Sequence, residues 1–272
     1  RIDELEPSFF GTYFGHRHIF AAEDTAAVHR ARLDLVTPAG RRIRFHSKNG
    51  APEPRVVRRE DGKVQRSWRM EEVAPVQRES RMPAAREICP TVEISTYGNW
   101  REFGRWWWSM IRRQYDTSPE MKAKVAELTA GRESATEKIR AIYDFVVTQV
   151  RYVAWEFGVH GYKPYKASTI FSRRHGDCKD KAILLGAMLR EVGIDAWPVL
   201  INADDSRSRD DLTVVLVDHF NHCIAYVPPA GDWEGGFLDG TAQYHPLGTV
   251  PNMDRGAKVV VFKRGEPEIM QV

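Results

Sequence analysis

The stretch Arg174-His175-Gly176-Asp177-Cys178-Lys179-Asp180-Lys181 decides the fold of the chain. Gly193 ends an apolar pattern that follows it at helical intervals, namely Ala182, Leu185, Leu189 and Val192. The pattern predicts a helix that starts at Cys178, with Asp177 as its N-cap. Unpaired N–H groups and the dipole at a helix start stabilise an anion, so they lower the pKa of a thiol placed there. Cys178 is therefore a candidate nucleophile.

Two later segments carry a possible base and a possible acid. His222 lies within residues 220–226, and Asp239 lies within residues 236–241; both segments have the apolar composition of sheet strands. The chain thus offers a thiol at a helix start, then an imidazole, then a carboxylate. A thiol enzyme that transfers acyl groups needs these three parts: a nucleophile, a base that activates it, and a group that orients the base.

Three local motifs carry a family resemblance: Gly176-Asp177-Cys178, Phe220-Asn221-His222 and Leu238-Asp239-Gly240-Thr241. They resemble the motifs of the transglutaminase-like superfamily, circularly rearranged relatives of papain, and the resemblance runs from about Trp100 to the C-terminus. More narrowly, the chain is similar to bacterial proteins in which a β-rich domain of unknown function precedes the transglutaminase-like domain. The resemblance implies that Cys178 is the nucleophile, His222 the general base and Asp239 the orienting acid. It leaves Tyr152 and Trp155 as candidates for the side chain that supports the oxyanion.

The resemblance also implies a reaction class. We expect a transglutaminase-like cysteine acyltransferase, or a cysteine protease or amidase, that forms a thioester with a protein or peptide amide. The sequence does not separate transfer from hydrolysis, and it gives no substrate identity. The alternative from another class is a catalytically inactive module that binds peptide or protein on the same fold. The intact set of Cys178, His222 and Asp239 favours the enzyme.

A metal centre is the next alternative. Four residues have side chains that bind zinc: His175, Cys178, His222 and Cys223. However, the chain has no Cys-x-x-Cys pair, and neighbouring residues of a strand point to opposite faces. We therefore expect no metal and no cofactor.

Several other residues compete for roles near these motifs. His219 competes with His222 as the base, but only His222 has the Phe-Asn-His context. Cys223 should point away from His222 into the core, because side chains alternate along a strand. Asp180 should brace the helix start, paired with Lys181 or Arg174. Trp106, Trp107 and Trp108 are consecutive on a predicted helix, so at least one should be exposed or lie at an interface.

Composition and charge narrow the class of protein. The chain has 272 residues, 42% hydrophobic and 28% charged, which is an ordinary globular composition. A net charge of +3 is too small to indicate binding to nucleic acid. No apolar run is long enough for a transmembrane helix. The chain begins at Arg1, which suggests a processed or shortened chain, so the missing signal peptide is uninformative; the resemblance favours a periplasmic or secreted location. Oligomeric state cannot be read from the sequence.

The local patterns predict two domains. Up to about residue 98, short alternating segments are separated by turns, as in residues 30–35 and 42–45 and in a hairpin over 55–68 with its turn at Asp61-Gly62. From residue 99 onward, capped helices precede further strands. We therefore predict an α+β protein with an antiparallel β-rich domain at 1–98, or part of one, and a papain-like, transglutaminase-like α+β domain at 99–272. The role of the β domain stays open.

Overall fold

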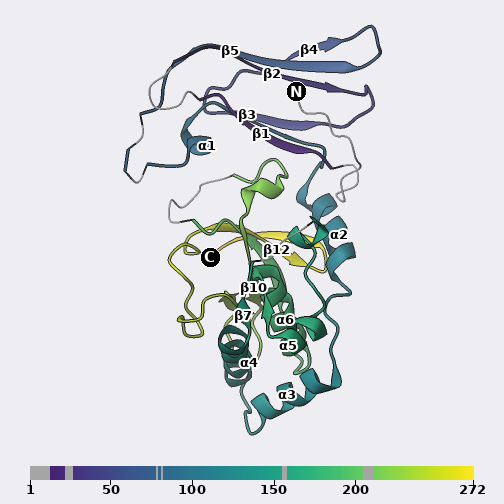
Figure 1. The fold of residues 1–272 in the computed structure, drawn as a ribbon, viewed down its shortest axis with the longest axis vertical. Helices are drawn as coiled ribbons and strands as arrows, with labels where there is room; N and C mark the ends of the chain where they lie inside the picture. The colour runs from purple at the N-terminus through teal and green to yellow at the C-terminus, as the bar shows by residue number, and fades with distance from the viewer. Residues whose placement is uncertain (1–12, 22–26, 78, 81, 155–157, 205–210) are drawn as a thin grey trace. The chain divides into compact units, whose positions relative to one another are not determined.

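The computed structural model describes residues 13–21, 27–77, 79–80, 82–154, 158–204 and 211–272. The chain forms two compact units, and Figure 1 shows the elements of each. The first unit comprises Arg1–Glu102 together with Ser208–His219, and the second comprises Phe103–Arg207 and Phe220–Val272. The mixture of helices and antiparallel sheets confirms the α+β class. The predicted boundary at residue 98 lies just before the first division and stays a prediction.

The first unit contains two three-stranded antiparallel sheets. One has the order β2-β5-β4, with β2 at Val28–Thr37, β5 at Val64–Val73 and β4 at Arg55–Arg58. The other has the order β1-β6-β3, with bounds Gly15–Ile19, Thr91–Ser95 and Arg44–Lys48, and the short helix α1 spans Ala85–Ile88. The predicted hairpin is confirmed, because β4 pairs with β5 and Gly62 adopts a positive φ of 76° in the turn.

The core of the first unit is built from both sheets. Its buried side chains are Phe20, Trp68, Val92 and Ile94, and further apolar residues of β2 and β3 pack against them. The ring of Trp68 meets that of Phe45 edge to face, with the centroids 5.6 Å apart. Strand β6 is the central strand of its sheet, and all five of its residues are buried.

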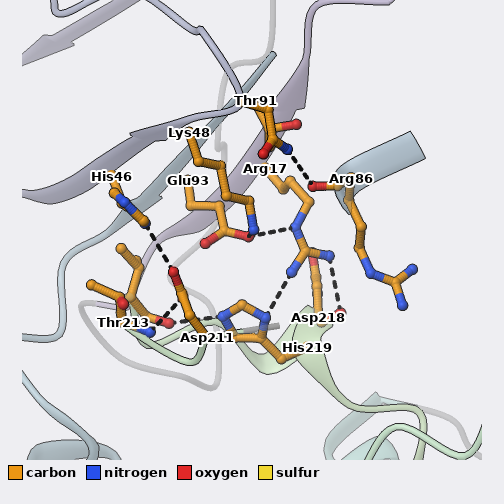
Figure 2. Close-up of polar contacts among 12 residues, drawn as sticks. Arg17, His46, Lys48, Arg86, Thr91, Glu93, Asp211, Thr213, Asp218 and His219 are labelled. Atoms are coloured by element: carbon orange, nitrogen blue, oxygen red, sulfur yellow. Dashed lines mark hydrogen bonds and ion pairs between the residues drawn. The ribbon is translucent and has the colours of Figure 1, made fainter. Parts of the chain in front are cut away.

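A buried acid lies at the centre of a polar network in this unit (Figure 2). Glu93 on β6 is fully buried, and its Oε1 accepts hydrogen bonds from Arg17 Nε at 2.9 Å and Lys48 Nζ at 3.0 Å. A buried carboxylate needs such partners to offset its loss of hydration. Arg17 also lies 2.8 Å from Nδ1 of His219 and donates to the carbonyl of Asp218. Residues 211–219 are therefore held by the first unit, although they follow β9 of the second in sequence.

The second unit is organised around a five-stranded antiparallel sheet with the order β11-β10-β9-β12-β13. The bounds are Gly236–Leu238 for β11, His222–Val227 for β10, Trp197–Ile201 for β9, Lys258–Lys263 for β12 and Glu266–Gln271 for β13. The strand that begins at His222 pairs with the strand that ends just before Asp239, with Ala225 of β10 facing Leu238 of β11. Buried valine and isoleucine side chains of β9, β10 and β12 form a common core.

The helices of the second unit begin at recognisable caps. Ser118 caps α3, Pro119–Thr129, and Ser134 forms a capping box with Glu137 at the start of α4, Ala135–Gln149. The remaining elements are α2 at Trp100–Ile111, η1 at Gly158–Gly161, α5 at Ala167–Arg173, α6 at Cys178–Arg190, and the parallel strand pair β7, Arg151–Tyr152, with β8, His175–Gly176. Among the described residues, no helix combines the length and the apolar character needed to cross a bilayer.

Helix α6 is the central helix of this unit. Every residue from Cys178 to Leu189 is buried, so the helix is covered on all sides rather than along one stripe. It packs against β9 and β10 as well as against α4 and α5. Because its surroundings are fixed on every side, the side chains at its N-terminus occupy defined positions.

Candidate active site

Cys178 is the first residue of α6, as the sequence predicts. Asp177 is the N-cap: its Oδ1 accepts from the N–H of Asp180 at 3.1 Å, and Asp180 Oδ2 accepts from the N–H of Asp177 at 3.3 Å. This reciprocal capping box satisfies two backbone donors and leaves the N–H of Cys178 at a helix end, where it has no intrahelical acceptor. The thiol is thus placed in the positive field of the helix start.

The partner of Asp180 differs from the one predicted. Its carboxylate pairs with Arg173 at 2.7 Å and accepts from the N–H of Tyr165 at 2.8 Å, rather than pairing with Lys181 or Arg174. Lys181 instead donates to the backbone carbonyl of Val150 at 2.6 Å. Spacing alone could not distinguish these partners, because α5 brings Arg173 to the helix start.

His222 and Asp239 meet where β10 and β11 lie side by side. Nε2 of His222 is 3.3 Å from Oδ1 of Asp239, and both side chains are largely buried. The same oxygen accepts hydrogen bonds from the N–H and Oγ1 of Thr241, at 2.8 and 2.7 Å. The carboxylate is therefore fixed by its own loop, in the Leu-Asp-Gly-Thr motif, and holds one side of the imidazole.

The electrostatics of the pair follow from burial and from these contacts. Burial lowers the pKa of His222, but hydrogen bonds to Asp239 and Cys178, together with their negative charges, outweigh it and raise this pKa to about 10. Burial acts to raise the pKa of Asp239, yet the hydrogen bonds to His222 and Thr241 and the imidazolium charge leave it below its ordinary value. Asp239 and Cys178 thus both favour the charged form of His222.

The other predicted candidates lie elsewhere or have other partners. The ring of His219 is buried in the first unit, with Nδ1 at Arg17 and Nε2 2.9 Å from the carbonyl of Val214. Cys223 is buried in the core, as its place on the strand predicts, and burial raises the pKa of its thiol. Of the two oxyanion candidates, Tyr152 is 46% exposed on β7, whereas Trp155 lies outside the described residues.

The three tryptophans of α2 differ in exposure. Trp107 is buried against Phe262, and Trp108 packs on the sheet core near Trp197. Trp106 is half-buried and lies beside Phe103. Their indoles are therefore mostly packed within the second unit.

One acidic residue near the pair has no signal in the sequence. Asp254, in the turn before β12, is fully buried, and neither of its carboxylate oxygens has a hydrogen-bond partner among the described residues. His222, Asp239 and Asp254 each offer one ligand atom, all within 4.8 Å of one another, so they could hold a cation. A ligating imidazole must be deprotonated, and the raised pKa of His222 opposes that. In the first unit, His46, Glu93 and Asp211 form a second such group, but Arg17 and Lys48 already neutralise Glu93.

A cavity of about 180 Å³ lies beside the helix start. Its lining includes Asp177 and Asp180 together with a stack in which Arg173 lies over Tyr165 and Tyr165 lies on His160. The ring centroids of His160 and Tyr165 are 3.9 Å apart. The described lining does not include Cys178, His222 or Asp239, so this cavity adjoins the site rather than containing it.

Two family models match the chain. Residues 122–233 match the model of the transglutaminase-like superfamily core, and residues 1–77 match a domain of unknown function, DUF3857. No protein with a curated description matches the chain.

One solved structure shares the fold. A crystal structure from Parabacteroides distasonis, described as a "putative protease", superposes with a TM-score of 0.67 at 17% sequence identity. The match covers 97% of this chain and 48% of the other, so this chain spans about half the length of that protein. A "putative cysteine protease" from Cytophaga hutchinsonii matches at 13% identity over 84% of this chain and 78% of its own, with a TM-score of 0.38.

Proposed function

Because the chain carries a transglutaminase-like superfamily core preceded by a DUF3857 domain, we propose that it catalyses thiol-dependent acyl chemistry on amides. Cys178 is the proposed nucleophile, His222 the base and Asp239 the group that orients the base. The observation that carries the proposal is the pairing of His222 with both Asp239 and the thiol at the start of α6. The structure named as a protease makes peptide amides the first substrates to test.

The reaction begins with the thiolate and imidazolium pair. The anion of Cys178 attacks the carbonyl carbon of the amide, a C–S bond forms, and the carbonyl π electrons move to the oxygen. Backbone N–H groups at the start of α6, including that of Cys178, are the proposed donors to this oxyanion. They serve this purpose because a helix start has N–H groups without intrahelical acceptors.

The tetrahedral intermediate then collapses to a thioester. The C–N bond breaks, and the leaving amine takes its proton from His222. In the second half, water or a primary amine attacks the thioester while His222 accepts its proton, and the C–S bond breaks to restore the thiolate. Asp239 keeps the imidazole in the orientation and tautomer that both halves need. Whether water or an amine completes the reaction determines whether the outcome is hydrolysis or transfer.

The test is release of ammonia or amine from glutamine-containing peptides and short peptide amides, with and without an added primary amine. Cys178→Ala should abolish turnover and keep the fold, because alanine suits the first turn of a helix. His222→Ala should leave at most a slow thiolate reaction. Asp239→Asn should also reduce turnover, since an amide cannot balance the imidazolium.

The three losses should be far from additive, because the residues act as one unit. Identical traces for the unsubstituted protein and Cys178→Ala across the amide panel would refute the enzyme. The inactive binding module would then be the better proposal.

A further inference from the structure

Asp254 is a buried acid of the second unit that the proposed reaction does not use. It is fully buried in the turn between Pro251 and Ala257, where its backbone N–H donates to the carbonyl of Pro251. Its two carboxylate oxygens have no hydrogen-bond partner among the described residues. An unpaired polar group in a protein interior lowers the stability of the fold. Without a hydrogen bond, the Asp254 carboxylate also does not stabilise the turn in which it lies. The fold itself therefore gives no reason for an acid at this position.

The groups that face Asp254 come from several elements. A ligand atom of Asp254 lies within 4.8 Å of one on His222, from β10, and of one on Asp239, after β11. Besides burial, the charges of Asp239 and Asp254 both raise the pKa of Tyr143 on α4, whose hydroxyl donates to the backbone carbonyl of Asp239. Lys181 of α6 interacts with the charge of Asp239. The charge of Asp254 can therefore change the pKa values, and so the protonation, of these neighbouring groups.

Burial and the neighbouring charge of Asp239 raise the pKa of Asp254 to about 6, while His222 acts in the opposite direction. Two carboxylates this close resist ionising together, unless a cation stands beside them. The imidazolium of His222 is the cation that shares the cluster. The charge of Asp254 and the protonation of His222 are therefore coupled.

We propose that Asp254 is a positioning residue that acts through His222, making it a stronger base when Asp254 is ionised. The inference rests on the proposed function, because it assigns His222 as the base. It matters most once Cys178 is acylated, since the thioester carries no charge and the thiolate no longer supports the imidazolium. Asp239 and Asp254 then balance the proton that His222 takes from the incoming water or amine. Asp254 itself forms and breaks no bond.

The experiment uses the protein after iodoacetamide has alkylated Cys178, because the neutral thioether mimics the acylated thiol. The protonation of His222 is followed by NMR as a function of pH, with the signal assigned from a His222→Gln variant. Asp254→Asn removes the charge and keeps the shape. Asp195→Asn is the matched control, because Asp195 is exposed between α6 and β9 of the same unit.

We expect Asp254→Asn to weaken proton binding by His222 at least about tenfold, as removal of a charge at this distance implies. Asp195→Asn should leave it unchanged. In the unsubstituted protein, the His222 signal should also show a second inflection near the ionisation of Asp254, and Asp254→Asn should remove it. That inflection tests the inference even if the variant folds poorly.

An unchanged His222 titration in Asp254→Asn, with no second inflection in the unsubstituted protein, would overturn the inference. The two proposals fail differently. If iodoacetamide does not label Cys178 preferentially, the proposed function is contradicted. If Cys178 is labelled preferentially but Asp254→Asn leaves the His222 titration unchanged, only the inference about Asp254 is contradicted.

Discussion

The strongest quantitative prediction concerns the charge of His222. Its pKa is raised from 6.5 to about 10. At about 1.4 kcal/mol for each tenfold change, that difference corresponds to about 5 kcal/mol in favour of the imidazolium. Asp239, 3.3 Å from the ring, and Cys178 together supply this stabilisation against the cost of burial. An opposite charge at such a distance changes a pKa by about 1 to 3.

Replacing Asp239 by Asn should therefore lower the pKa of His222 by about 1 to 3. A histidine whose pKa is raised on folding stabilises the protein fully below pH 6.5, and that contribution is lost as the pH rises through about 10. The unsubstituted protein should lose more stability over this range than Asp239→Asn does. The difference should approach about 1 to 4 kcal/mol, which is the pKa change expressed as free energy.

The assay is an NMR titration of the assigned His222 signal, combined with urea unfolding across the same pH range. Both measurements are repeated in a Cys178→Ala background, which removes the thiol and isolates the contribution of Asp239. A His222 that titrates near 6.5 in the unsubstituted protein would refute the reasoning. So would equal midpoints with Asp and Asn at position 239 in the Cys178→Ala background.

Three further predictions follow from buried groups and caps. Limiting iodoacetamide near neutral pH should label Cys178 before Cys89 and Cys223, because burial raises the pKa of both of those thiols. If peptide mass mapping finds the label on Cys89 or Cys223 first, the assignment of Cys178 as the nucleophile is contradicted. Burial lowers the pKa of Lys181 to about 8, so the unfolded state binds more protons than the folded state between pH 8 and 10.5, and the free energy of unfolding rises with pH there. Lys181→Met should remove a rise of about 2 kcal/mol in the free energy of unfolding, measured in urea between about pH 7 and 10. The same pH dependence in the variant and the unsubstituted protein would contradict this. Ser134→Ala removes one half of the capping box of α4 and should cost about 1 kcal/mol in the same assay, with an unchanged midpoint as the contrary result.

The sequence was sufficient for features whose causes are local. The capping residues Asp177 and Ser134 and the helix that begins at Cys178 follow from patterns within a few residues. The family resemblance supplied the assignment of roles to Cys178, His222 and Asp239. Those roles remain proposals.

Features that depend on distant packing could not be predicted in this way. Strand β6 contains the charged Glu93, so its segment does not read as the central strand of a sheet; only Arg17 and Lys48 on the flanking strands make that burial acceptable. Strand β13 is an edge strand whose alternation is interrupted by Pro267. Asp254 lies in a turn of ordinary composition, and only tertiary structure brings it to His222.

The segment at residues 211–219 has a practical consequence for dividing the protein. The chain passes from one unit to the other three times, after residues 102, 207 and 219. Dividing the chain at a single peptide bond therefore cannot separate the two units. A shortened chain that starts at residue 103 would keep Leu212, Val214 and Leu216 but lose partners from the first unit such as Tyr13, whose hydroxyl accepts from the N–H of Val217. Expression of the second unit by itself would therefore leave an apolar loop without its cover, immediately before the strand that carries His222. Ala203 and Asn221 are joined by hydrogen bonds of 2.8 and 3.1 Å, so a short polar turn grafted between them is the better route to an autonomous second unit.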